Sequence, residues 1–344
     1  MSSSPSVPTS GPLAQIASKS RTWISAWAKD WPIWWSEQSA FSKWAPIVFF
    51  VIYWAVLYSL NSLHSDHIAS GVAFNLMSYT GRGPRKLRAF LFPLILTGII
   101  YDSQRFYSDY IRGPIHVQEP YNFDKKVFGI HTDQGVLTPN EYWQLHTHWF
   151  LDLITGFAYL VFIAIFVFSS AAFRFWYSRK GTKKMSAQEI LVRAPAMMWG
   201  FFWVNMIGYS TYYWFAAAPP WYVAKYGLGP ARMDVGPSQA GCVRFDQLLG
   251  THFFSDFYGR SADVFGAIPS LHVSYPLIAA IFAFRFGALQ IPTTLFYLLM
   301  CFSAVYLNHH YILDILWGSS YAVIIATLVD AFYLKRFREQ RAKV

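Results

Sequence analysis

The chain has few charged residues, and this shortage indicates its class. Asp, Glu, Lys and Arg make up only 13% of the 344 residues, whereas in a soluble domain they make up about a quarter. Hydrophobic residues make up 54% and aromatic residues 20%, and several apolar runs are long enough to cross a bilayer. This composition excludes an ordinary soluble domain and predicts a polytopic membrane protein.

Cysteine is almost absent. Cys242 falls in a predicted loop and Cys301 in an apolar run, and they are the only two cysteines, so we expect no disulfide. Neither has the spacing of a metal ligand, and no Cys, Asp or Glu set completes a site with His146 and His148. We therefore expect neither a metal nor a cofactor.

Acidic residues are scarce too, with 18 against 28 Lys and Arg and a net charge of +10. The excess positive charge is compatible in principle with nucleic acid. However, the basic residues cluster in the short segments 81–88 and 178–184 and at the C-terminus, which is typical of cytoplasmic loops. We expect no nucleic-acid partner, and we expect the long loops at about 103–147 and 217–270 to lie on the non-cytoplasmic face.

The first 20 residues lack the apolar core of a signal peptide, and their Ser/Pro-rich composition predicts a disordered tail. Residues 21–344 are expected to form a single integral membrane domain with a catalytic core at about 194–334. The fold class is all-α, a helical bundle with about six or seven transmembrane helices. The predicted spans lie at about 45–62, 87–102, 148–172, 194–216, 271–286, 290–307 and 311–334.

A first chemical motif is FGAIPSLHVSYP at 265–276. Pro269 and Ser270 precede an apolar run, so we predict a helix that Ser270 caps, with His272 in its first turn. Free backbone N–H groups and the helix dipole make such an end an anion site. The alternative is a capped helix with an interfacial histidine.

A second motif is LNHHYILDIL at 307–316. His310 and Asp314 are spaced i, i+4 and would share a helix face. The carboxylate would hold one imidazole nitrogen and leave the other as a nucleophile or base. His309 would lie about 100° around the helix, so we expect it to contact substrate or pack at the interface. A structural His–Asp pair is the alternative.

The two motifs are predicted to meet. Between His272 and His310 the chain runs along one helix and back along another, each about 17 residues or roughly 25 Å long. Both histidines then lie at the same membrane face. Two histidines and an aspartate beside a helix N-terminus predict phosphoryl transfer, in which one histidine attacks phosphorus and the other handles protons.

These residues resemble the type 2 phosphatidic acid phosphatase superfamily, whose pattern is K-x6-R-P, then P-S-G-H, then S-R-x5-H-x3-D. Lys225 and Arg232 have the spacing of the first motif, with Met233 in place of Pro. The stretch PSLH at 269–272 matches the second, with Leu in place of Gly.

The third motif is matched by Ser303, His310 and Asp314, but Ala304 stands where Arg is expected. The chain is most similar to the inositol phosphorylceramide synthase (aureobasidin-resistance) branch of this superfamily. The resembling stretches are APPWYVAKYGLGPA (218–231), GCVRFDQLLGTHFF (241–254), VFGAIPSLH (264–272), YLNHHYILDILWGS (306–319) and, more weakly, YDSQR (101–105) and TPNEYW (138–143).

The resemblance implies a metal-independent reaction with His310 as nucleophile, Asp314 as its orienting partner and His272 as general acid and then general base. It also implies an active site on the non-cytoplasmic side, which is the periplasmic face of a bacterial inner membrane or the Golgi lumen.

Several residues are candidates for substrate binding. We expect Lys225, Arg232 and the backbone near Ser270 to stabilise the transition-state charge. Arg105 is expected either to bind the headgroup or to form a local ion pair with Asp102.

The expected function is a phosphosphingolipid synthase. It would transfer inositol phosphate from phosphatidylinositol to ceramide through a phosphohistidine and release diacylglycerol. Because a phosphodiester carries less charge than a phosphomonoester, Ala304 favours a transferase over a phosphatase, although Arg244 or Arg260 would be able to replace the missing Arg.

The alternatives are a membrane lipid phosphate phosphatase, a transferase with another headgroup or acceptor, and a non-catalytic transporter or scaffold. The expected partners are the phospholipid donor, the ceramide-like acceptor and the membrane. The sequence leaves open whether a small membrane subunit or a second copy of the chain is also a partner.

Overall fold

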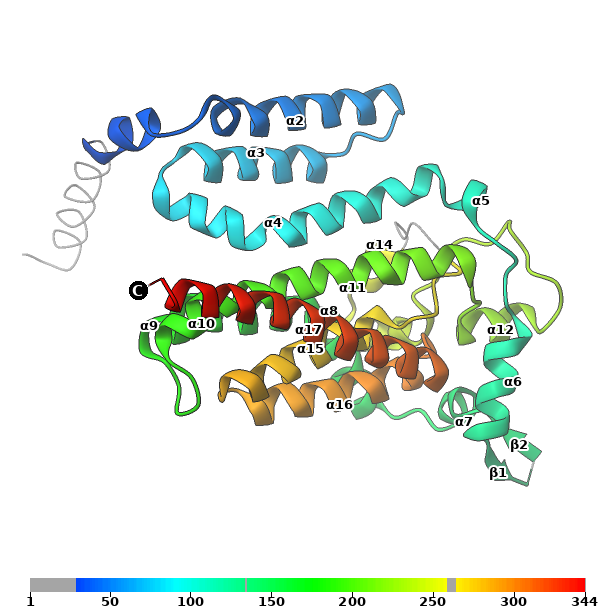
Figure 1. The fold of residues 1–344 in the computed structure, drawn as a ribbon. Helices are drawn as coiled ribbons and strands as arrows, with labels where there is room; N and C mark the ends of the chain where they lie inside the picture. Colours follow the sequence, from blue (N-terminus) through cyan, green and yellow to red (C-terminus); the bar gives the residue numbers. More distant parts are fainter. Residues whose placement is uncertain (1–28, 134, 259–263, 344) are drawn as a thin grey trace, which may run out of the picture. The chain divides into compact units, whose positions relative to one another are not determined.

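The computed structural model describes residues 29–133, 135–258 and 264–343. It is a helical bundle (Figure 1), and in the part described the only strands are the antiparallel pair β1 (Ile130–Thr132) and β2 (Gly135–Leu137). The predicted all-α membrane fold is confirmed. Contacts divide the chain into two compact units, Met1–Phe92 and Pro93–Val344. The predicted tail at 1–20 lies outside the described residues.

The first unit is built on a helical hairpin. After a helical segment at 29–36, it contains α2 (Ala40–Ser59), α3 (Ser65–Tyr79) and the start of α4 (Arg82–Ser103). The Phe50 and Phe74 rings lie 5.3 Å apart, and Trp54 donates to the His67 carbonyl at 3.0 Å. The helix α3 is not among the predicted spans, because its polar residues interrupt the apolar pattern of a span.

The second unit contains the end of α4, the strands β1 and β2, and the remaining helical elements. They are η1 (Gln104–Phe106), α5 (Ser108–Ile111), α6 (Gln118–Val127), α7 (Pro139–Leu145), α8 (Trp149–Ala171), η2 (Ala172–Tyr177), α9 (Ser178–Lys180), α10 (Ala187–Arg193), α11 (Pro195–Trp214), α12 (Pro220–Tyr226), η3 (Ala240–Cys242), α13 (Val243–Leu249), α14 (Phe253–Tyr258), α15 (Leu271–Phe286), α16 (Gln290–Tyr306) and α17 (Ile312–Arg341).

Four stretches of helix in the described part are long and apolar enough to cross a membrane, and α15 and α16 are shorter apolar helices. The four stretches are Ala40–Ser59, Trp149–Lys180, Ala187–Trp214 and Ile312–Arg341. The apolar runs that predicted spans in the C-terminal half therefore form helices at the expected places, and α15 has the predicted bounds.

The core of the second unit is α15, which packs against α8, α11, α16 and α17. Small residues permit the closest approach. A Cβ on Gly318 of α17 would lie 2.2 Å from the Ser270 carbonyl oxygen, and the Ser274 hydroxyl donates to the Gly318 carbonyl at 2.9 Å. This contact places the start of α15, with His272, against the first turns of α17.

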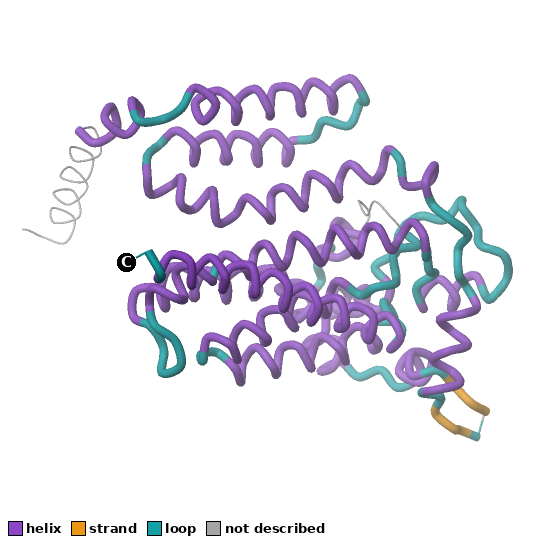
Figure 2. The backbone as a smooth tube through the Cα atoms, in the orientation of Figure 1, coloured by secondary structure: helices purple, strands orange, loops and turns teal. Residues whose placement is uncertain are grey.

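The loops of the second unit contact the end of the bundle where α15 and α17 begin. Figure 2 shows that its long loop segments gather at one end of the helices. Short extended pieces pair in parallel at His116, Ala217 and Gly266. The backbone N–H of Trp221, at the start of α12, donates to the Asn308 carbonyl at 3.1 Å. The loops are thereby fastened to the turn between α16 and α17.

Candidate active site

The predicted meeting of the two histidines occurs. His272 Nδ1, in the first turn of α15, lies 3.0 Å from His310 Nε2, in the turn between α16 and α17. The two residues are 38 positions apart in sequence. The helical hairpin of α15 and α16 brings them together, as the matched lengths of these helices predicted.

The reason expected for the His310–Asp314 contact is wrong, although the contact exists. His310 does not lie on a helix, because α16 ends at Tyr306 and α17 begins at Ile312. Asp314 is instead the third residue of α17 and accepts a hydrogen bond from the Tyr311 N–H at 3.0 Å, which caps the helix. The same carboxylate oxygen lies 3.2 Å from His310 Nδ1.

The surroundings of His310 select one tautomer. Its Nδ1 faces two acceptors, the Ala267 carbonyl at 3.0 Å and the Asp314 carboxylate at 3.2 Å. A proton on Nδ1 satisfies both, so Nε2 carries the lone pair. That lone pair points at His272 Nδ1, which donates to it in this arrangement.

Burial keeps His310 neutral. The side chain is about 5% exposed, and desolvation lowers its pKa to about 4, opposed by the hydrogen bond to the Ala267 carbonyl. A neutral imidazole with a free Nε2 lone pair is a competent nucleophile. His272 is less completely buried than His310.

Asn140 supports the turn that carries His310. Its amide donates to the His310 carbonyl at 3.0 Å and to the Val305 carbonyl at 3.1 Å. Asn140 is buried and lies in the stretch TPNEYW. That stretch resembles the family, but nothing in its sequence indicates a contact with residues more than 160 positions away.

Asp124, on α6, supports α17 from the other side. Its two oxygens accept the N–H groups of Ile312 at 2.7 Å and Leu313 at 3.0 Å. The carboxylate is fully buried, and desolvation raises its pKa to about 7, opposed by these two hydrogen bonds. Asp124 could not be predicted from the sequence, because these partners lie 188 and 189 residues further along the chain.

Aromatic rings surround the histidines. Tyr159 of α8 stacks on His272 with ring centroids 4.8 Å apart and on His309 at 5.1 Å. Tyr258 of α14 stacks on His309 at 4.9 Å, and its hydroxyl lies 3.5 Å from His272 Nε2. Neither tyrosine was predicted at the site, because nothing in the sequence distinguishes them among the chain's 22 tyrosines.

His309 is buried beside the pair but has its own partners. Its Nε2 lies 3.2 Å from the Gln239 carbonyl and 3.4 Å from Cys242 Sγ. Burial lowers the pKa of His309 well below its usual value. As expected, the partner of Asp314 is His310 and not His309. Cys242 and Cys301 are free thiols, as predicted.

Ser270 lies at the site, but its side chain does not cap α15 as we expected. Its backbone N–H donates to the Asp314 carbonyl at 2.9 Å. The hydroxyl is buried and has no hydrogen-bond partner in the described part of the chain. The serine therefore contributes an unused hydroxyl next to the His–His–Asp group.

In the described part of the chain, the cations that we predicted to bind substrate do not contact His272 or His310. Lys225 is exposed on α12 over the Tyr226 ring, and Arg232 is exposed and pairs with Asp234 at 2.8 Å. Neither has a contact with the histidines in the described structure. Arg105 pairs with Asp102, which is the local ion pair given as the alternative to headgroup binding.

Ala304, at the position where the superfamily has an arginine, is enclosed by the protein. Ala304 is fully buried, and its carbonyl accepts the N–H groups of His309 at 3.1 Å and His310 at 3.0 Å. Arg244, one of the two proposed substitutes, pairs with Asp152 at 2.5 Å and donates to the Tyr306 carbonyl at 3.3 Å. The other, Arg260, lies outside the described residues.

No cluster of three or more His, Cys, Asp or Glu side chains that would hold a metal ion occurs in the described segments. The site thus consists of a buried neutral histidine, a second histidine in contact with it, a carboxylate and unpaired polar atoms. This set can perform nucleophilic and acid–base chemistry.

Comparison with known proteins agrees with this chemistry. The family model of the PAP2 superfamily matches residues 143–328. The chain is 36% identical to a phosphoinositol dihydroceramide synthase of Bacteroides thetaiotaomicron over 267 residues, which are 76% of this chain and 83% of that protein.

The chain is also 30% identical to the inositol phosphorylceramide synthase catalytic subunit aur1 of Schizosaccharomyces pombe over 243 residues, which are 69% of this chain. Here the match spans about half of the relative, 53% of its length. No solved structure matches the chain.

Proposed function

This chain belongs to the PAP2 superfamily, and we propose that it is an integral membrane phosphosphingolipid synthase. It transfers inositol phosphate from phosphatidylinositol to the primary hydroxyl of a ceramide-like acceptor and releases diacylglycerol. The observation that carries this proposal is the 3.0 Å contact between His310 Nε2 and His272 Nδ1, in a chain similar to a phosphoinositol dihydroceramide synthase.

In the first step His310 Nε2 attacks the phosphorus of the donor lipid. A bond forms between Nε2 and phosphorus, and the bond between phosphorus and the diacylglycerol oxygen breaks. The entering phosphodiester takes the place of the resting contact between the two histidines, so His272 Nδ1 lies beside the leaving oxygen. The negative charge of the substrate favours the doubly protonated form of His272, which gives its proton to that oxygen.

In the second step the acceptor hydroxyl attacks the phosphohistidine. His272, now neutral, takes the hydroxyl proton, the new phosphorus–oxygen bond forms, and the bond to His310 breaks. Use of one residue as acid and then as base follows from running the same geometry in reverse. Asp314 holds the Nδ1 proton and offsets the positive charge that develops on the His310 ring.

The small number of cations among the described residues of the site supports a diester substrate. A phosphomonoester dianion requires more positive charge than a phosphodiester monoanion, but Ala304 replaces one arginine and Arg244 is engaged by Asp152. We propose that Lys225, one turn beyond the Trp221 N–H that holds Asn308, contacts the headgroup phosphate. Ser270, with its unused hydroxyl, is proposed as a further donor.

We also propose that the site faces the non-cytoplasmic side. Basic residues cluster at 178–184 and in the last turns of α17, and such clusters are typical of cytoplasmic ends. His310 lies two residues before α17 begins, beside the end of that 30-residue helix that is opposite the basic residues.

The experiment is a transfer assay with purified protein, labelled phosphatidylinositol and ceramide. Wild type and His131→Ala, which removes an exposed histidine of β1, should form labelled inositol phosphorylceramide. His310→Ala and His272→Ala should not. Acid-labile label on wild-type protein in the absence of ceramide, missing from His310→Ala, would support the phosphohistidine.

The competing function is hydrolysis of a lipid phosphate, which the same two histidines can catalyse. Release of inorganic phosphate from phosphatidic acid by the wild type, with no headgroup transfer to ceramide, would refute the synthase in favour of the phosphatase.

A further inference from the structure

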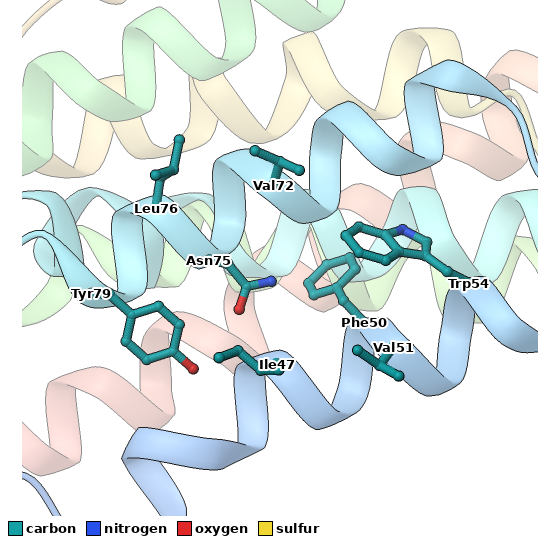
Figure 3. Close-up of a pocket in the computed structure, with 8 residues that line it drawn as sticks. All are labelled: Ile47, Phe50, Val51, Trp54, Val72, Asn75, Leu76 and Tyr79. Atoms are coloured by element: carbon teal, nitrogen blue, oxygen red, sulfur yellow. The ribbon is translucent and has the colours of Figure 1, made fainter.

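A groove between α2 and α3 lies in the first unit and includes none of the histidine-site residues. Figure 3 shows side chains of both helices turned toward it. Its volume is about 290 Å³, which is close to the lower limit of the volumes of small-molecule pockets, ~300 Å³. The groove is lined by Ile47, Phe50, Val51, Trp54, Val72, Asn75, Leu76 and Tyr79.

A glycine sets how closely the two helices approach. A Cβ on Gly71 would lie 2.4 Å from the Trp54 ring and 2.5 Å from the Phe50 ring, so these rings pack directly on the α3 backbone. One end of the groove is thus closed by aromatic side chains. Leu76, with 58% of its surface exposed, and Val72 with 45% leave its side open.

Asn75 places an unpaired acceptor inside this apolar groove. Its amide nitrogen donates to the Gly71 carbonyl at 2.9 Å, and this bond fixes which end of the amide is nitrogen. Its oxygen is buried and has no partner in the described structure, and Figure 3 shows the side chain extending between the helices. A buried unpaired carbonyl is costly, so the groove suits an occupant that brings an N–H or O–H donor.

Two basic residues, Lys43 and Arg85, lie near the other end of the groove, beside its lining residue Tyr79. Tyr79, which lines it, donates to the Lys43 carbonyl at 2.8 Å, and Arg85 of α4 donates to the Ser42 hydroxyl at 3.4 Å. Lys43 lies over the Trp35 ring. Neither Lys43 nor Arg85 has a carboxylate partner in the described part of the chain. Two cations without a described carboxylate partner, one in the first turn of α2 and one in the first turn of α4, attract an anionic headgroup.

We propose that this groove binds one anionic phosphosphingolipid molecule. Its phosphodiester lies at Lys43 and Arg85, its amide or hydroxyl group donates to Asn75, and one aliphatic chain lies along Val72 and Leu76. A glycerophospholipid with the same headgroup brings only ester acceptors to the depth of Asn75. A hydrophobic helix of another protein brings no phosphate to the cations. Charge and hydrogen bonding therefore select one class of occupant.

The test is lipid binding by native mass spectrometry with purified, delipidated full-length protein. Inositol phosphorylceramide is the probe, phosphatidylinositol the glycerolipid comparison and sphingomyelin the zwitterionic comparison. Wild type should bind one inositol phosphorylceramide, about fivefold more tightly than phosphatidylinositol, which corresponds to one hydrogen bond. Sphingomyelin should bind more weakly still. The readout needs no turnover, so it is independent of the proposed reaction.

Variants separate the three parts of the site. Leu76→Trp fills the groove and should abolish binding, whereas Val56→Trp adds the same ring at an α2 residue that is 50% exposed and outside the groove, and should not. Asn75→Leu should remove the preference for the sphingolipid but retain binding. Substituting both cations, Lys43→Gln with Arg85→Gln, should remove the preference for an anionic headgroup.

Three results would overturn the proposal. They are equal retention of all three lipids by the wild type, unchanged binding in Leu76→Trp, and a mass showing that a second copy of the chain, lost in Leu76→Trp, covers the groove. If Asn75→Leu binds inositol phosphorylceramide as tightly as the wild type does and keeps the preference over phosphatidylinositol, the sphingolipid assignment is refuted.

Discussion

Replacing Asp314 with Asn removes the charge beside His310 but keeps an oxygen in nearly the same place. The asparagine oxygen can still accept the Tyr311 N–H, now at 3.0 Å from Oδ2, and the proton on His310 Nδ1. The Ala267 carbonyl, 3.0 Å from Nδ1, accepts that proton as well. The reactive tautomer of His310 should therefore survive the substitution.

The substitution should lower kcat/KM only by removing the electrostatic stabilisation of the charged His310 ring in the transition state. A full charge pair at 3.2 Å is worth about 5 kcal/mol at an effective dielectric constant of about 20. About half a unit of charge on the ring in the transition state gives about 2.5 kcal/mol, or a loss of about 70-fold in kcat/KM. Loss of the correct tautomer in a catalytic triad costs about 10⁴-fold, much more than this.

The assay is kcat/KM for headgroup transfer by Asp314→Asn, with thermal unfolding measured to exclude a folding defect. Asp133→Asn, at an exposed loop position, is the matched control and should behave as wild type. A loss of 10⁴-fold or more in a folded Asp314→Asn protein would show that the Ala267 carbonyl does not hold the tautomer. An unchanged rate would remove Asp314 from the mechanism.

Three further predictions concern the same end of the bundle. Because burial lowers the pKa of His310 to about 4, its imidazole is neutral above that pH. The acid limb of kcat/KM due to His310 should therefore lie near pH 4, and an acid limb at about pH 6.5 that is also present in single-turnover attack would contradict this. Asp124→Asn leaves one buried N–H of α17 without an acceptor and should cost about 1–3 kcal/mol of stability in chemical unfolding; an effect as small as that of Asp133→Asn would refute the capping role. Gly318→Ala places a methyl group 2.2 Å from the Ser270 carbonyl and should lower both Tm and activity, whereas a wild-type Tm would show that α15 and α17 can separate without cost.

The residues around His310 show how far sequence reasoning reaches. The i, i+4 spacing with Asp314 led to a correct contact for a wrong reason, because the expected helix begins two residues after His310. The same limit applies to α3, where local apolarity is too weak to indicate a helix that Phe50 and Trp54 of α2 stabilise by packing.

Sequence by itself determined the membrane class, the apolar helices of the C-terminal half and the meeting of His272 with His310. These follow from composition, periodicity and matched helix lengths, all of which are local properties of the chain. Tertiary structure alone decided which nitrogen of His310 is free, since the Ala267 carbonyl comes from a loop 43 residues away. It also decided the supporting roles of Asn140 and Asp124, because a hydrogen bond across 165 or more positions leaves no trace in the local sequence pattern.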